Sequence, residues 1–176
     1  GDIALAAGAG DPGSLTVSWQ DGALAAAGPG IATQGLAGIA TLRPFGEPRI
    51  ASEFTIDRLA MTATPAPVVP LRLTGTAEIP ADGPITAEAS AMGAAGALTA
   101  ALNLRHDRAT GEGQLDVAAE PISLAPGVRQ PVDLLPVLSG LPVEAVTGTV
   151  SGLSARITWG DGTTSTGRAT LTDLTI

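Results

Sequence analysis

The stretch Leu71-Arg72-Leu73-Thr74-Gly75-Thr76-Ala77-Glu78-Ile79 decides the fold, because every second residue in it is apolar or glycine. Successive side chains of a β-strand point to opposite faces of the sheet. A strand with this sequence therefore has one apolar side and one polar side. The stretch predicts a strand that is covered on a single face.

The same alternation returns in window after window of the chain. It recurs at 85–91, 98–104, 114–117 and 153–159. Turn-forming residues, mostly Asp and Gly, stand at 20–22, 81–84, 106–113 and 160–162. These residues favour hairpin turns. We therefore expect an all-β fold: an antiparallel meander that forms a curved, twisted sheet shaped as a β-groove.

Two segments depart from the simple alternation. Val146, Gly148 and Val150 share one face, but the alternation resumes at Leu153 one residue out of step, which predicts a β-bulge at Gly152. Residues 131–138 have Pro near the start, an acidic residue in the first turn and Gly140 past the end. This pattern predicts one short helix, which Pro136 keeps to one or two turns.

The composition narrows the functional classes. The chain has 176 residues, 44% of them apolar but only 2% aromatic, and its formal net charge is −8. It has no cysteine, which excludes disulfides and Cys-based zinc sites. Its basic residues are all arginine and are scattered, so a nucleic-acid partner is not expected. Codon bias accounts for much of the alanine, yet a core of such small side chains also suits an apolar face that borders something else.

Candidate groups for chemistry each have a simpler explanation. His106 beside Asp107 lacks a convergent nucleophile, and we expect a solvated hairpin loop there. Asp161-Gly162 lacks the series of oxygen ligands that calcium needs. Glu78 and Asp82 fall at a strand end and its turn. Trp19 and Trp159 are interpreted as packing on the sheet, so we expect no catalytic residue, no metal and no cofactor.

The remaining candidate site is the apolar face itself. Such a face needs a cover, which could be a second sheet from this chain, another domain or lipid. The alternation assigns these residues to its lining: Leu71, Leu73, Ala77, Ile79, Ile85, Ala87, Leu98, Ala100, Leu102, Leu104, Leu115, Val117, Leu153, Ala155, Ile157 and Trp159.

Residues 130–176 contain several segments that resemble a known family. They are Gln130-Pro131-Val132-Asp133-Leu134-Leu135-Pro136, Gly148-Thr149-Val150-Ser151-Gly152, Ile157-Thr158-Trp159 and 167–174. Together they resemble the C-terminal region of the YdbH-like members of the AsmA-like envelope proteins, a superfamily that includes TamB-like proteins. The rest of the chain resembles the family only in its general character: it has many alternating strands that are rich in Thr, Gly and Ala.

The resemblance implies a function and a location. It implies a bridge-like lipid transfer protein in the periplasm of a Gram-negative cell, whose apolar β-groove carries phospholipid acyl chains between the inner and outer membranes. The 176 residues would then be one β-rich segment of a larger envelope protein that is anchored in the inner membrane elsewhere. Implied partners are phospholipid, the rest of that chain and an outer-membrane lipoprotein or another envelope protein. The residues alone also allow a structural or adhesive β-sandwich or β-solenoid with a closed core, or an enzyme fragment whose site lies elsewhere.

Overall fold

The computed structural model describes residues 1–7, 13–26, 30–93, 96, 98–140 and 145–175. Within these residues it has eleven strands and two short helical turns. They are β1 (Asp2–Ala7), β2 (Leu15–Ala26), β3 (Ile31–Arg43), β4 (Arg49–Met61), β5 (Leu71–Pro80), β6 (Ile85–Gly93), β7 (Thr99–His106), β8 (Gly113–Ala119), β9 (Ile122–Leu124), α1 (Pro131–Leu134), η2 (Pro136–Gly140), β10 (Thr147–Trp159) and β11 (Thr164–Thr175).

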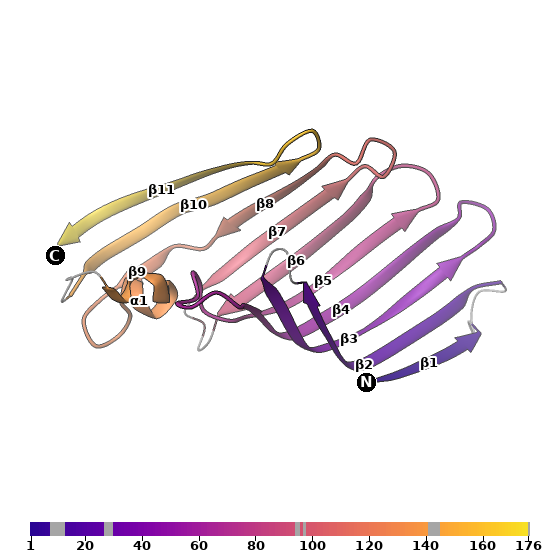
Figure 1. The fold of residues 1–176 in the computed structure, drawn as a ribbon, viewed down its shortest axis with the longest axis horizontal. Coiled ribbons are helices and arrows are strands. Elements are labelled where there is room, and N and C mark those ends of the chain that lie inside the picture. The colour runs from indigo at the N-terminus through magenta and orange to yellow at the C-terminus, as the bar shows by residue number, and fades with distance from the viewer. Residues whose placement is uncertain (8–12, 27–29, 94–95, 97, 141–144, 176) are drawn as a thin grey trace.

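All these strands belong to one open antiparallel sheet. Its order is β1-β2-β3-β4-β5-β6-β7-β8-β10-β11, and β9 pairs with β10 beside β8 (Figure 1). The predicted all-β meander is confirmed. The described strands form no second sheet.

Cross-strand pairs divide the side chains between two faces, because directly opposed residues share a face. We call the side that carries Leu73, Ala91, Ala100 and Ala119 the apolar face, since these residues are successive partners across β5 to β8. The opposite side carries Thr74, its partner Ser90 and the other intervening residues, and we call it the polar face.

Bulges bend the long strands β2, β3 and β4. The pairing of β2 with β3 shifts on both sides of Gly22, Asp21 has a φ of 53°, and Gly35 has a φ of 62°. In Figure 1 the far ends of β2 and β3 curl in front of the rest of the sheet, on the side where α1 lies. The hairpin turn expected at 20–22 is therefore wrong, because Asp and Gly adopt positive φ in a bulge as readily as in a turn.

Other local predictions are confirmed. The turns at 81–84 and 160–162 fall between strands that are neighbours in the sheet, and the turn expected at 106–113 occupies 107–112 between β7 and β8. The pairing of β10 with β11 shifts between Ser151 and Ser154, around Gly152, whose φ is 60°. The predicted helix at 131–138 becomes α1 followed by η2, and Leu135, with φ −126° and ψ 82°, leaves the helical conformation because it precedes Pro136.

The buried core is small and lies on the apolar face. Leu73, Ala91 and Ala100 form one cluster. Ile122, Leu124, Leu134 and Val146 form another near α1. The molecule exposes 11,049 Å², whereas a compact monomer of this mass is expected to expose about 7,800 Å². The chain therefore exposes much more surface to solvent than a compact monomer of its mass.

Candidate functional site

The structure brings nearly all the predicted lining residues together on the apolar face. Register places Leu71, Leu73, Ala77, Ile79, Ile85, Ala87, Ala100, Leu102, Leu104, Leu115, Val117, Ala155, Ile157 and Trp159 on that side. Leu98 packs against the cluster around Ile122 and lies just before β7. Leu153 falls within the β10 bulge, is 36% exposed and has no assigned partner in the ladder.

The apolar face extends further than the sequence predicted, onto β1 to β4. Added residues include Ile3, Leu5, Leu15, Val17, Trp19, Leu36, Leu42, Ile50, Phe54, Ile56 and Leu59. These residues could have been predicted from an apolar alternation that changes phase within a strand. In β4 the apolar phase runs through Phe54 and Ile56 and then slips to Leu59, where the pairing with β5 also shifts.

The apolar face carries a row of small side chains. Ala40, Ser52, Ala77 and Ala87 are successive cross-strand partners on β3 to β6. Their row crosses the strands over about 14 Å, given strand spacings of about 4.8 Å. The neighbouring row on one side holds the larger partners Leu42, Ile50 and Ile79. We call the row of Ala40, Ser52, Ala77 and Ala87 the lane, and the row of Leu42, Ile50 and Ile79 beside it the ridge. Both rows cross the strands and so follow the axis of the sheet.

The row on the other side of this lane contains aromatic side chains. Phe54 lies opposite Gly38 and Gly75. Trp19 is also opposite Gly38, and a Cβ on Gly38 would come within 2.5 Å of the indole. The indole Nε1 of Trp19 is buried and has no hydrogen-bond partner in the described part of the chain. The packing role that the sequence predicted for Trp19 agrees with these contacts.

His106 is not in the solvated loop where we expected it. It is the last residue of β7, half-buried, and its ring stacks on Trp159 with the ring centroids 6.0 Å apart. Trp159 Nε1 donates a hydrogen bond to His106 Nδ1 at 3.3 Å. The cross-strand register that joins β7, β8 and β10 places the two rings together, and the local sequence contains no signal for it.

A cap formed by β9, α1 and η2 covers one end of the apolar face. The Val146 N–H donates to Gln130 Oε1 at 2.7 Å, and Gln130 Nε2 donates to the Val146 carbonyl at 3.0 Å. Gln130 N–H donates to Asp133 Oδ2 at 2.7 Å, and Val69 N–H donates to the Leu134 carbonyl at 3.1 Å. These bonds hold Leu134 over the cluster of Ile122, Leu124 and Val146.

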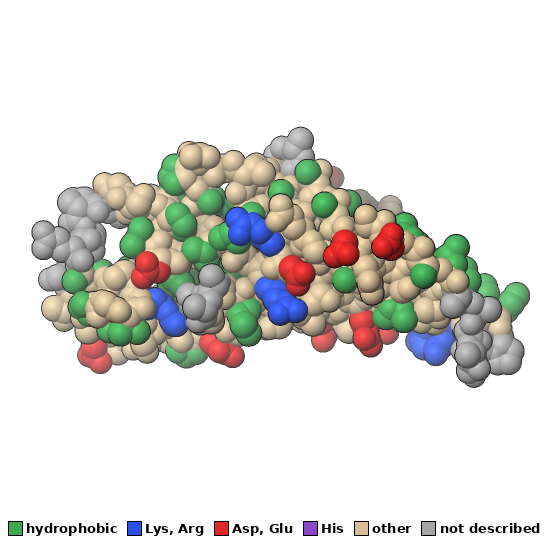
Figure 2. All heavy atoms as spheres, turned by 90° about the horizontal axis from the view of Figure 1, so that it is seen from below, with side chains coloured by type: hydrophobic (Ala, Val, Ile, Leu, Met, Phe, Trp, Pro, Cys, Tyr) green, Lys and Arg blue, Asp and Glu red, His purple; other side chains and the backbone are tan. Residues whose placement is uncertain are grey.

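The apolar face is open at the opposite end of the sheet. Ile3 is 74% exposed and Leu5 is 69% exposed, both on β1. Figure 2 shows an elongated body that thins toward the β1 and β2 side, where hydrophobic side chains lie at the surface. The apolar face is therefore covered at the α1 end and uncovered at the β1 end.

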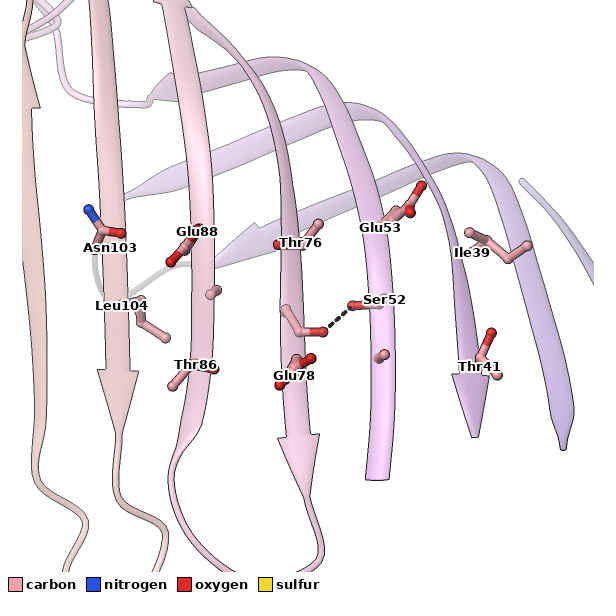
Figure 3. A pocket seen from close by; sticks show the side chains of 13 residues that line it. Ile39, Thr41, Ser52, Glu53, Thr76, Glu78, Thr86, Glu88, Asn103 and Leu104 are labelled. Atoms are coloured by element: carbon pink, nitrogen blue, oxygen red, sulfur yellow. Dashed lines mark hydrogen bonds between the residues drawn. The ribbon is translucent and has the colours of Figure 1, made fainter. Parts of the chain in front are cut away.

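The polar face is hollowed. A hollow of about 580 Å³ spans β3 to β7. Thr41, Glu53, Thr76, Glu78, Thr86 and Glu88 are prominent in its lining, as Figure 3 shows. Their hydroxyls and carboxylates suit water and polar solutes rather than alkyl chains.

Ion pairs also lie on the polar face. Arg156 Nε donates to Asp116 Oδ1 at 2.5 Å, and Gln114 Nε2 donates to Asp116 Oδ2. The hydrogen bond from Arg156, with help from Gln114, holds the pKa of Asp116 below its ordinary value of 3.8. Asp57 and Arg72 form a second pair at 3.7 Å. These contacts keep the polar face charged.

Neither a metal centre nor a membrane-spanning helix is found in the part of the chain that the structure describes. His, Asp and Glu side chains there form no group of three or more that could hold a metal ion. The helices of the described ranges are all too short or too polar to cross a bilayer.

Comparison with protein-family models, with curated proteins and with solved structures finds no match to this chain. The resemblance to the YdbH-like proteins therefore stays a prediction from the sequence.

Proposed function

We propose that the apolar face binds the acyl chains of phospholipids and that this chain is a segment of a lipid-transfer groove. One observation carries the proposal: a single open sheet has one apolar side, which its own chain leaves partly exposed over most strands and open at the β1 end. Exposed apolar patches of this extent mark a ligand or partner site.

The chemistry of the apolar face suits alkyl chains. The lane of Ala40, Ser52, Ala77 and Ala87 presents small side chains, and the ridge of Leu42, Ile50 and Ile79 borders it. Burial of each methylene of a lipid is worth about 0.8 kcal/mol. Because these side chains include no charged group, an alkyl chain meets similar surroundings at successive strands and is free to slide.

The sequence resemblance adds a cellular location and a parent protein to the proposal. A segment of this kind would lie in the periplasm of a Gram-negative cell, as part of a bridge between the inner and outer membranes. Head groups would remain in water beyond the rim of the apolar face, while acyl chains follow the sheet axis. The proposal needs no catalytic residue and no cofactor.

A pair of matched substitutions tests the proposal. Ala87→Glu places a charge on the apolar face, and Ala101→Glu makes the same chemical change on the polar face. We expect Ala87→Glu to bind a phosphatidylethanolamine with a fluorescent acyl chain roughly tenfold more weakly than the delipidated parent, because an unpaired charge is costly among alkyl chains. Ala101→Glu should bind like the parent.

A folding check and a second variant on the apolar face complete the test. Circular dichroism checks that each variant is folded, and Ala77→Phe narrows the same lane without adding charge. Equal binding by the parent, Ala87→Glu and Ala77→Phe would contradict the proposal. The alternative of a structural domain with a closed core predicts that delipidated protein binds neither this lipid nor a hydrophobic dye.

A further inference from the structure

Three hairpin turns lie side by side along the upper right of the molecule in Figure 1, where they join β3 to β4, β5 to β6 and β7 to β8. We call this edge, which consists of residues 44–48, 81–84 and 107–112, the hairpin rim. The ridge is the row of the apolar face next to the hairpin rim, because its residues lie one or two positions from these turns or from the strand ends that lead into them.

Hydrogen bonds connect the three turns of the hairpin rim. The Ala81 N–H donates to the Pro48 carbonyl at 2.7 Å, which joins the first two turns. Arg108 Nη2 donates to the Pro80 carbonyl and, at 2.8 Å, to the Ala81 carbonyl. The guanidinium of Arg108 therefore reaches from the third turn across the end of β6 to the end of β5.

Asp107 fixes the turn that carries Arg108. Its Oδ1 accepts the N–H groups of Ala109 at 2.8 Å and of Thr110 at 3.3 Å, and its own N–H donates to the Glu112 carbonyl at 2.8 Å. These bonds shape the turn, so Arg108 is held in position before any ligand binds.

Two further arginines adjoin Arg108 at the hairpin rim. Arg49 is the cross-strand partner of Pro80, whose carbonyl accepts from Arg108. Arg43 is in turn the cross-strand partner of Arg49. Like charges directly opposite one another are destabilising in a sheet. The row therefore concentrates positive charge at a place where an anion would be stabilising.

Arg49 and Arg108 have no carboxylate partner in the part of the chain that the structure describes. Glu47 and Asp82, the acidic residues of the first two turns, pair with neither of them there. Within the same ranges Arg108 uses Nη2 for both of its hydrogen bonds, which leaves the N–H groups of Nε and Nη1 for a ligand. Planar guanidinium groups with free N–H donors match the oxygens of a phosphate.

We propose that Arg49 and Arg108, with Arg43 beside them, bind the phosphate group of a lipid whose acyl chains lie on the apolar face. The inference rests on the proposed function and adds to it the part of the lipid that the chain recognises. Ile79 of the ridge directly precedes Pro80, so a lipid with its phosphate over Pro80 has its alkyl chains beside the ridge. The phosphate would receive charge-assisted hydrogen bonds from two guanidinium groups and offset their repulsion.

Two water-soluble lipids with the same pair of eight-carbon acyl chains separate the head group from the tails. Dioctanoyl phosphatidic acid has a phosphate, and dioctanoylglycerol has none. We expect the delipidated chain to bind the phosphatidic acid about tenfold more tightly in isothermal titration calorimetry. The double variant Arg49→Gln/Arg108→Gln should bind both lipids equally. Arg58→Gln, a control toward the other end of β4, should keep the preference.

A single variant separates loss of the phosphate contact from damage to the turns. Arg49→Gln breaks no hydrogen bond within the described ranges, so we expect it to fold like the parent and to lower the preference about threefold. Affinity for dioctanoylglycerol should stay unchanged in every variant, since the apolar face is intact. A preference that survives in the double variant, or disappears in Arg58→Gln, would overturn the inference.

Two outcomes with the parent distinguish this inference from the proposed function. Equal binding of the two lipids would overturn the phosphate site and leave the proposed function standing, whereas binding of neither lipid would overturn both. Inorganic phosphate is the third ligand, and it should bind at least about a hundredfold more weakly than the phosphatidic acid because it buries no alkyl chain. Equal affinity for inorganic phosphate would assign the arginines to the free ion and overturn the lipid assignment.

Discussion

The indole of Trp159 lies over Gly113, its cross-strand partner on β8, so closely that a Cβ on Gly113 would come within 2.1 Å of Cζ2 of the ring. Trp19 covers Gly38 in the same way on the same face, nearer the β1 end of the sheet. Glycine at both positions lets a large ring lie flat on the backbone of the neighbouring strand. An aromatic side chain thereby restores the apolar contact that the glycine lacks.

Substitution of Gly113 should therefore be destabilising. Gly113→Ala should lower the free energy of unfolding by about 1–3 kcal/mol, because the added methyl group overpacks against the ring. Chemical denaturation followed by Trp fluorescence measures the change. Gly162→Ala is the control, since a Cβ there meets nothing within 4 Å. Equal stability of the two variants would contradict the contact.

The cap depends on the amide of Gln130. Gln130→Ala leaves the N–H and C=O of the buried Val146 without their side-chain partners, so we expect a loss of about 1–3 kcal/mol in unfolding free energy. Hydrogen exchange at the Val146 amide should accelerate by a larger factor than exchange in β5. Gln20→Ala, at an exposed glutamine of β2, serves as the control. Unchanged protection of Val146 would show that the amide does not hold the cap.

The ion pair of Asp116 makes a contribution to stability that depends on pH. Its pKa in the folded protein lies below 3.8, mainly because Arg156 donates to it. The contribution is therefore present above about pH 4 and is lost as pH falls through 3.8 toward the folded value. Asp116→Asn should have a Tm that declines less between pH 5 and about pH 2 than the Tm of the parent. Asp82→Asn should follow the parent, and identical profiles for all three proteins would refute the assignment.

Much of the fold could be predicted because one physical rule dominates the sequence. A period of two specifies which side chains share a face, and the stretches in β5 to β8 obey it without interruption. Gly152 could be assigned to a bulge because the phase slip lies beside a residue that tolerates positive φ. The same reasoning assigned a turn to Asp21-Gly22, since nothing local distinguishes a turn from a bulge within a longer strand.

Other features depend on contacts between distant parts of the chain. Gln130 and Val146 are separated by sixteen positions, and their pairing requires the path of the cap to be known. The stacking of His106 on Trp159 joins residues fifty-three positions apart. Bulges in β2 to β4 hid the apolar face of these strands, because each extra residue reverses the side that later residues take.

Site-specific photocrosslinking shows which face of the sheet binds lipid. A diazirine amino acid is placed at Leu102 or Ile157 on the apolar face, and at Asn103 or Arg156 on the polar face, so that each pair differs only in the side of one strand. The chain is expressed in the envelope of a Gram-negative cell, irradiated and analysed by mass spectrometry. Phospholipid adducts should form from Leu102 and Ile157 and be at least about tenfold rarer from Asn103 and Arg156, because alkyl chains avoid charged surfaces. Adducts confined to the polar-face positions, or equal from both faces, would contradict the account.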